Sequence, residues 1–164
     1  MEFCYTLPLQ RWLNMKPPVP QTAAAPFFCW DVHMLTVQSR KAVLAMNRAS
    51  RYSLLFYGMN RADWTRLPEM MRDEIRAVIL REGLSEFEAA RYFALGGPLN
   101  ISTAHGSTAA LNWAMGVLLR YSYLLDAGRL SQPQAAHIIN GEVYHTIGQC
   151  GSPREFFLQG FQHL

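Results

Sequence analysis

The chain has 164 residues, half of them hydrophobic, and a formal net charge of +3 at neutral pH. This length matches one globular domain, and a chain of this size buries about 70% of its unfolded surface, so it needs neither a disulfide nor a metal to fold. No apolar run approaches the roughly 18 residues of a membrane span, and the first residues lack the pattern of a signal peptide. We therefore expect a single cytoplasmic domain over residues 1–164 with no membrane contact.

The first part of the chain carries weak structural signals. Residues 2–6 alternate between polar and apolar types and can form a short strand, and residues 8–15 can form a helix. Four prolines then fall within residues 16–26. Because proline lacks a backbone donor and fixes φ, this Pro-rich segment is predicted to be a loop.

Residues 30–58 predict a three-stranded β-meander. The expected strands are 30–38, 42–47 and 52–58, and short basic turns separate them. The second and third strands are apolar at nearly every position. Strands of that kind are usually covered on both faces, so we expect helices to pack on at least one side of this sheet.

Helical signals follow the meander. One helix is predicted from Pro68, which suits a first helical position, to Gly83, which suits the residue after a helix end. Its apolar stripe consists of Met71, Ile75, Val78 and Ile79. Two capping boxes predict further helix starts, at Ser85-Glu86-Phe87-Glu88 and Ser152-Pro153-Arg154-Glu155.

The order of these elements predicts an α+β fold. We expect a mostly antiparallel sheet, built on the meander at 30–58 and covered by amphipathic helices. Residues 99–103 are a candidate for a further core strand. The C-terminal part at 107–164 is predicted to be helical.

The meander also carries a motif that resembles a known family. The motif reads Trp30-x-x-His33-Met34-Leu35-Thr36-Val37-x-x-Arg40-Lys41, then Val43-x-x-Met46-Asn47, Ser50-Arg51-Tyr52 and Leu55-x-Tyr57-Gly58. It is similar to a family of uncharacterised small bacterial proteins that is classed only as a domain of unknown function. This resemblance implies a bacterial protein built on such a meander, and it implies no activity.

Positive charge gathers around the turns of the meander. No acidic residue lies between Asp31 and Asp63. That span contains five cationic residues, which are Arg40, Lys41, Arg48, Arg51 and Arg61. Arginine and lysine side chains at exposed turns can bind phosphates, so these five form a candidate anion or nucleic-acid site. The alternative interpretation is that the turns are simply solvated.

A second candidate site is the hydroxyl-rich loop that enters the longest predicted helix. Its polar residues are Thr103, His105, Ser107 and Thr108. A helix N-terminus offers free N–H groups and the positive end of the helix dipole, so an anion can bind there. The alternative is plain capping of the helix by Ser107.

No catalytic or metal motif stands out in the sequence. Cys29 and His33 share a face of a predicted strand, and His145 precedes Cys150 by five residues, but neither pair has the spacing of a known metal site. A Gly-x-Ser-x-Gly nucleophile motif is also absent. We therefore predict no catalytic residue, no metal and no cofactor.

Composition suggests a protein that associates. Charged residues make up 16% of the chain, below the roughly 25% typical of soluble proteins. The predicted terminal helix adds an aromatic face of Phe156, Phe157 and Phe161. Because an exposed apolar face favours association, we expect a homodimer, with another protein partner as an alternative.

Three functions follow from these features, in order of preference. The first is a non-enzymatic interaction module, because nothing in the sequence specifies a reaction. The second is binding of nucleic acid or of a nucleotide phosphate through the basic turns of the meander. The third is a small enzyme whose site no motif reveals.

Overall fold

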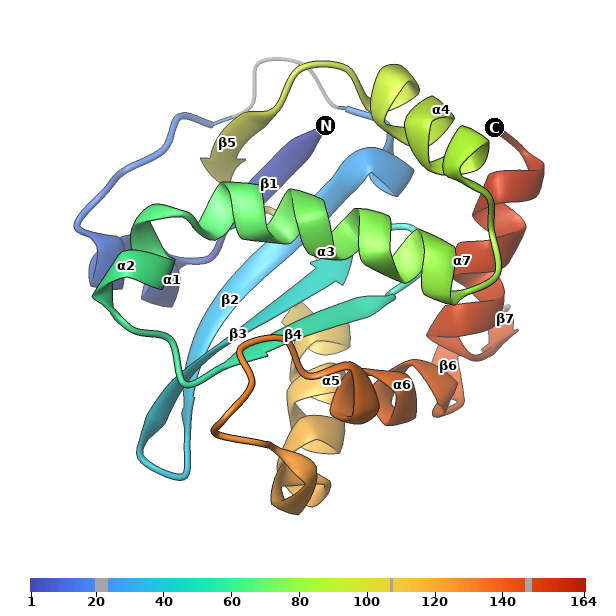
Figure 1. Cartoon of the computed structure of the whole chain (residues 1–164). Coiled ribbons are helices and arrows are strands. Elements are labelled where there is room, and N and C mark those ends of the chain that lie inside the picture. Colours follow the sequence, from blue (N-terminus) through green and yellow to red (C-terminus); the bar gives the residue numbers. More distant parts are fainter. Residues whose placement is uncertain (20–23, 107, 147–148) are drawn as a thin grey trace.

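The computed structural model describes residues 1–19, 24–106, 108–146 and 149–164. At its centre is a five-stranded sheet with the strand order β4-β3-β2-β1-β5 (Figure 1). The strands are β1 (Glu2–Tyr5), β2 (Cys29–Val37), β3 (Arg40–Asn47), β4 (Ser53–Tyr57) and β5 (Asn100–Thr103). Within the described residues, no helix is long and apolar enough to cross a membrane.

Three consecutive strands of this sheet are antiparallel neighbours. β2 pairs with β3, and β3 pairs with β4. They occupy the three segments that the sequence predicted as a meander, with ends that differ by one or two residues. The Pro-rich segment at 16–26 lies partly outside the described residues, and its last residue begins a short 3-10 turn (Pro26–Phe28).

The prediction of a mostly antiparallel sheet is wrong. β1 lies between β2 and β5 and is parallel to both, with Phe3 in register with Trp30 and with Ile101. Parallel neighbours need long crossover connections, usually helical. The first crossover contains α1 (Leu7–Leu13), and the path from β4 to β5 contains three helices. The sheet is therefore mixed, because these connections bring β1 and β5 in from distant parts of the chain.

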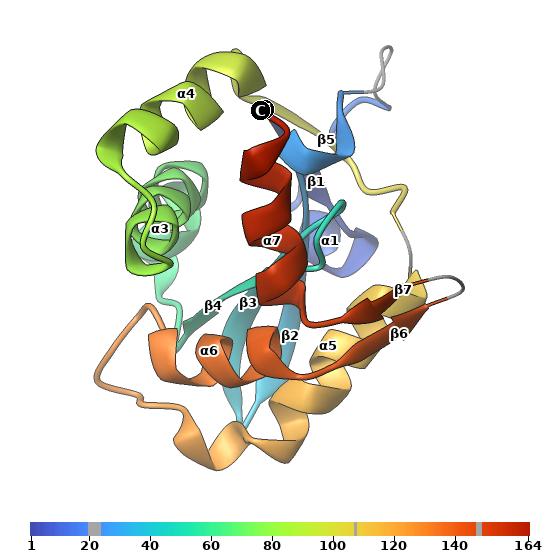
Figure 2. The ribbon, with the colours of Figure 1, turned by 90° about the vertical axis from the view of Figure 1, so that its right-hand side faces the viewer.

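Helices cover both faces of the sheet (Figure 2). One face carries α3 (Leu67–Arg81), α4 (Glu86–Gly96) and α7 (Pro153–Gln162), and the other carries α5 (Thr108–Arg120) and α6 (Pro133–Gly141). The short helices α1 and α2 (Arg61–Thr65) lie near one end of the sheet. The C-terminal part also contains a 3-10 turn (Ser122–Leu124) and a hairpin of β6 (Tyr144–Thr146) and β7 (Gln149–Gly151), so it is not purely helical.

Side-chain alternation along the strands explains why both faces are covered. On β3, Val43 and Ala45 join the core beneath α3. The intervening residues Ala42, Leu44 and Met46 join a second core beneath α5 and α6. The run of five apolar residues in β3, residues 42–46, thus buries side chains on both faces of the sheet, in agreement with the sequence analysis.

The predicted helix signals are confirmed. The apolar stripe of α3 is almost completely buried, with at most 1% exposure for Met71, Ile75, Val78 and Ile79. Capping boxes open α4 at Ser85 and α7 at Ser152. In each box the serine side chain accepts from a backbone N–H while a glutamate accepts from the serine N–H.

The terminal helix packs inside this chain. Phe157 and Phe161 of α7 are buried against Tyr92 of α4 and against Phe27. The polar atoms of the cluster are satisfied, since Trp30 Nε1 donates to the Tyr92 hydroxyl over 3.0 Å and that hydroxyl donates to the Phe27 carbonyl over 2.7 Å. Two of the three residues of the aromatic face that led us to expect a homodimer, Phe157 and Phe161, are therefore used within one chain, whereas Phe156 is partly exposed. The homodimer remains a prediction, supported only by the low charge content.

Candidate functional site

Polar side chains occupy one face of the strands β1, β2 and β5. The register brings Cys4 beside Asp31 on one side and beside Ser102 on the other. Glu2 and Cys29 are also in register, and the Cys29 thiol donates to the Glu2 carboxylate over 3.6 Å. All five residues are at most 5% exposed. Because burial of polar groups is costly unless they are hydrogen-bonded, this face of the sheet is a candidate for a functional site.

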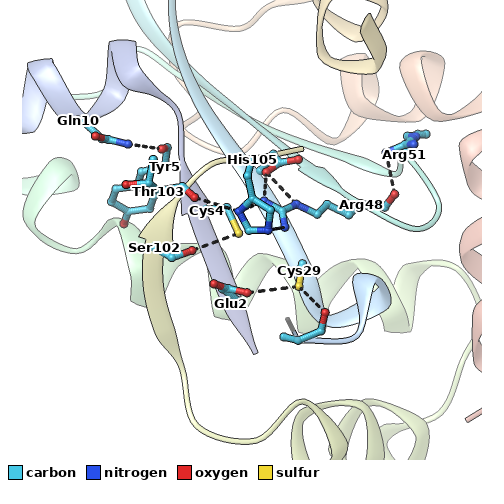
Figure 3. Close-up of polar contacts among 12 residues, drawn as sticks. Glu2, Cys4, Tyr5, Gln10, Cys29, Arg48, Arg51, Ser102, Thr103 and His105 are labelled. Carbon is cyan, nitrogen blue, oxygen red and sulfur yellow. Dashed lines mark hydrogen bonds and ion pairs between the residues drawn. The ribbon is translucent and has the colours of Figure 1, made fainter. Parts of the chain in front are cut away.

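Arg48 reaches this polar face from the turn between β3 and β4 (Figure 3). Its Nε and Nη2 both donate to Oδ1 of Asp31, over 3.0 and 2.8 Å. The side chains of Arg48 and Asp31 are only 12% and 4% exposed. Burial acts against the charge of Arg48, but the hydrogen bond and the charge of Asp31 outweigh it and raise the pKa of Arg48.

His105 contacts the same guanidinium group. Nη1 of Arg48 lies 2.8 Å from Nε2 of His105, and Nδ1 of His105 lies 3.2 Å from the carbonyl oxygen of Thr103 (Figure 3). Nη2 of Arg48 also lies 3.4 Å from Nδ1 of His105. Because arginine can only donate, the imidazole is the acceptor of the shorter contact, at Nε2.

The second carboxylate oxygen of Asp31, Oδ2, is buried and has no hydrogen-bond partner among the described residues. Gly106 lies directly against it, because a Cβ built at position 106 would be 1.8 Å from Oδ2. Any side chain there would displace the carboxylate. Asp31 and Gly106 both line a pocket of 280 Å³. The unpaired oxygen thus belongs to a residue that lines a space a small molecule can enter.

The remaining wall of this pocket, which we call the Asp31 pocket, is amphipathic. Its larger apolar side chains come from the α1 and α5 segments and are Leu7, Pro8, Leu111 and Met115. Its other polar side chains are Thr6, His33, Thr108 and Asn112. Oγ1 of Thr6 and Nδ1 of His33 are 3.0 Å apart. Burial lowers the pKa of His33, so its imidazole is neutral at neutral pH.

The two buried thiols of this polar face, Cys4 and Cys29, have low reactivity. Burial raises the pKa of Cys4 to about 12 and that of Cys29 to about 11. The thiolate, not the thiol, is the form that attacks substrates and binds metals. Cys29 and His33 do share a face of β2, but the described residues contain no group of three or more His, Cys, Asp or Glu side chains that could hold a metal ion. The polar side chains of this site can therefore bind a ligand through hydrogen bonds.

The five predicted anion-binding residues do not form one site. Arg48 is held by Asp31, and the guanidinium of Arg51 donates to the carbonyl oxygen of Arg48 over 2.7 Å. Arg40 and Lys41 are the first two residues of β3, roughly 25 Å from Arg48 by the rise of an eight-residue strand. Arg61 begins α2, three residues after Gly58, whose N–H donates to the carbonyl oxygen of Lys41.

The predicted loop site overlaps the Asp31 pocket in part. His105 contacts Arg48, and Thr108 lines the pocket at the start of α5. The hydroxyl of Thr103 is already used, because it donates to the carbonyl oxygen of Pro17 over 2.9 Å. Ser107 lies outside the described residues.

Asp31 and Gly106 were not predicted as site residues. A signal for Asp31 existed, since it is an acid between the apolar residues Trp30 and Val32 of a strand, and a buried acid normally has a cationic partner. The sequence around Gly106 carries no such signal. Its role depends on contact with β2, which only the folded chain shows.

The fold and the site together define an α+β protein with a mixed five-stranded sheet, helices on both faces and a buried polar pocket. The chain belongs to the family described as Domain of unknown function (DUF6933), whose model matches residues 3–156. No curated protein and no solved structure matches it. The family covers every strand of the main sheet and the whole Asp31 pocket, and its description assigns no activity.

Proposed function

We propose that the protein is a non-enzymatic binding module that takes a small molecule in the Asp31 pocket. One observation carries this proposal: Oδ2 of Asp31 is buried without a hydrogen-bond partner anywhere in the described chain. An unpaired buried acceptor costs about 1–3 kcal/mol, and more if it is charged. Such atoms are rare in native proteins and call for a specific partner. A ligand that donates a hydrogen bond to Oδ2 supplies one.

The charge balance of the pocket favours a neutral donor. Arg48 already neutralises Asp31 in an ion pair that is almost completely buried. A cationic ligand would meet the Arg48 charge and the positive end of the α5 dipole. A neutral N–H or O–H group forms the hydrogen bond without taking another charge out of water.

The volume and lining of the pocket further restrict the class of ligand that can bind. A volume of 280 Å³ lies just below the range for ligand pockets, which begins near 300 Å³. The side chains of Leu111 and Met115 suit a short hydrocarbon or aromatic part. The ligand class is therefore a small amphipathic molecule with an N–H donor, such as a primary amide or a nitrogen heterocycle.

The neighbouring groups favour binding over catalysis. Cys4 and Cys29 remain protonated because their pKa values are raised by burial. The hydroxyl of Thr6 and the imidazole of His33 contact each other at 3.0 Å. That distance is within the reach of a nucleophile and its base, but no hydrogen bond among the described residues orients the imidazole from its other nitrogen, so the third group of an activated nucleophile is missing.

An NMR titration with benzamide tests this function. Benzamide carries an apolar ring and N–H donors, whereas N,N-dimethylbenzamide keeps the ring and has no donor. We expect millimolar benzamide to shift the backbone resonances of Asp31 and Gly106, and the dimethyl compound to leave them unchanged. Benzamide should remain chemically unaltered after prolonged incubation with the protein.

Two glycine variants supply the controls. Gly106→Ala places a methyl group against Oδ2 and should abolish the benzamide shifts. Gly116→Ala in α5 adds a methyl group with no heavy atom within 4 Å and should leave them intact. Equal shifts with both compounds, shifts that survive in Gly106→Ala, or no shift with any of a panel of small primary amides would contradict the proposal.

A further inference from the structure

A larger groove lies between α1 and α2, which are side by side at one end of the sheet (Figure 1). Its volume is 720 Å³, and the indole rings of Trp12 and Trp64 line it. The two rings meet edge to face, with centroids 5.8 Å apart. Trp12 is 47% exposed, although tryptophan is usually well buried. This Trp12–Trp64 groove therefore presents aromatic surface to solvent.

Unpaired cations surround the groove. Nζ of Lys41 lies 4.7 Å from the centroid of the Trp12 ring, and Arg61 lines the groove itself. Arg40 precedes Lys41 on β3, so its side chain leaves the strand on the opposite face and is not a cation of the groove. Neither Lys41 nor Arg61 forms an ion pair with another described residue.

Acidic side chains do not cancel this charge. Six other surface arginines of the described chain have acidic partners, namely Arg66, Arg76, Arg81, Arg120, Arg129 and Arg154. The exposed Arg11 and Arg72, like Arg61, form no ion pair with the described residues, but they do not line the groove. The acid within α2, Asp63, is used as a helix cap, because its carboxylate accepts from the backbone N–H of Asn60 over 2.8 Å. The cations beside the two indoles thus remain available to an anionic ligand.

We propose that the Trp12–Trp64 groove binds single-stranded nucleic acid. Bases would stack on the two indoles, and phosphates would contact the two cations Lys41 and Arg61. Surfaces that bind single strands combine these two features, because every base has a face that can stack on an aromatic ring. A duplex hides its base faces and an acidic peptide has none, so both would use the cations and leave the indoles without a role.

This groove is separate from the Asp31 pocket. The two share no lining residue. The groove also excludes Arg48 and Arg51, which the sequence grouped with the other cations, because Arg48 is bound to Asp31 at the other end of β3. Nucleic-acid binding here therefore does not depend on a ligand in the Asp31 pocket, and Gly106→Ala should leave it unchanged.

Fluorescence anisotropy with a labelled oligothymidine, measured over a range of salt concentrations, tests the proposal. Two phosphate contacts on a single strand predict a log–log salt slope of about −1.4. The double variant Lys41→Gln/Arg61→Gln should bring the slope close to zero, since both contacts are removed. Trp12→Ala should weaken binding about 5- to 150-fold, because it removes one stacking ring.

A matched control removes two charges elsewhere. Arg76 and Arg120 are 60% and 62% exposed, and Arg76→Gln/Arg120→Gln should leave affinity and slope unchanged. Thermal unfolding checks that each variant is folded. If Trp12→Ala does not fold, the salt slope of the Lys41→Gln/Arg61→Gln variant tests the proposal by itself. Three results would overturn the proposal: no binding at low salt, equal weakening by the control variant, or competition by duplex DNA or polyglutamate as strong as by unlabelled oligothymidine.

Discussion

Arg48 donates twice to one oxygen of Asp31 and makes no contact with the other. The two oxygens of the Asp31 carboxylate therefore have different roles. Oδ1 anchors the turn between β3 and β4 to β2, and Oδ2 is left as an acceptor beside Gly106. The structural role keeps the carboxylate in place, and that fixed position is what a binding site needs.

Breaking the Asp31–Arg48 ion pair from one side should destabilise the fold strongly. Asp31→Ala leaves the guanidinium of Arg48 buried without its counter-ion, and such a loss costs about 3–5 kcal/mol. Urea-induced unfolding measures the change. The double variant Asp31→Leu/Arg48→Met removes both charges, so it should be clearly more stable than Asp31→Ala alone.

An exposed pair provides the comparison for this experiment. Arg76 and Glu86 are both 60% exposed, so Glu86→Ala should cost no more than about 1 kcal/mol. If Asp31→Ala were as mild as Glu86→Ala, the Asp31–Arg48 pair would not be the anchor that its burial indicates.

Truncation of the α3 stripe should also be costly. Ile75 is fully buried in the core between α3 and the sheet, and Ile75→Ala should lower the free energy of unfolding by about 2–4 kcal/mol. Asp73→Ala, on the exposed side of the same helix, should change it by no more than about 0.5 kcal/mol. A loss below about 0.5 kcal/mol for Ile75→Ala would mean that the stripe is solvated.

Stability should fall in mild acid because of His33. Its folded-state pKa is lowered by burial, whereas in the unfolded chain the pKa is about 6.5. Below about pH 6.5 the unfolded chain therefore binds a proton that the folded chain does not, and the free energy of unfolding falls by up to about 1.4 kcal/mol per pH unit until the folded pKa is reached. Urea unfolding at a series of pH values measures this slope.

Two histidine variants isolate that contribution. His33→Gln should flatten the slope below about pH 6.5, whereas His137→Gln, at an exposed position of α6, should retain it. An unchanged slope in His33→Gln would assign the acid sensitivity to other groups.

The three cysteines should react unequally with a thiol reagent. Cys4 and Cys29 are buried and have raised pKa values, whereas Cys150 is exposed. In mildly alkaline buffer, Ellman's reagent should modify one thiol rapidly in the native protein and all three after denaturation. Rapid native modification of Cys4 or Cys29, located by peptide mass spectrometry, would contradict their burial.

Local signals predicted much of the fold. The stripe of α3 and the capping boxes at Ser85 and Ser152 depend on residues within a few positions of one another, so the sequence alone reveals them. Local signals do not predict the placement of β1 between β2 and β5, since parallel pairing depends on where long crossovers return the chain. That is why a mostly antiparallel sheet was expected and a mixed one is present.

Part of the candidate site could also be predicted from the sequence. Once Trp30 is opposite Asn47 in the β2–β3 pair, Arg48 falls opposite Cys29 and two positions from Asp31, a diagonal spacing at which long side chains meet. The ion pair therefore follows from the hairpin register. The contact of Gly106 with Oδ2 does not, because it requires β5 to lie beside β1 and the following loop to turn back over β2.

A crystal structure of the protein soaked with benzamide shows directly whether Asp31 Oδ2 binds the ligand. We expect the amide nitrogen within hydrogen-bond distance of Asp31 Oδ2, about 2.7–3.2 Å, with the ring against Leu111 and Met115 and with Arg48 still on Oδ1. Density for benzamide elsewhere, or an Asp31 carboxylate whose two oxygens are both occupied by Arg48 or by other protein donors, would contradict this expectation.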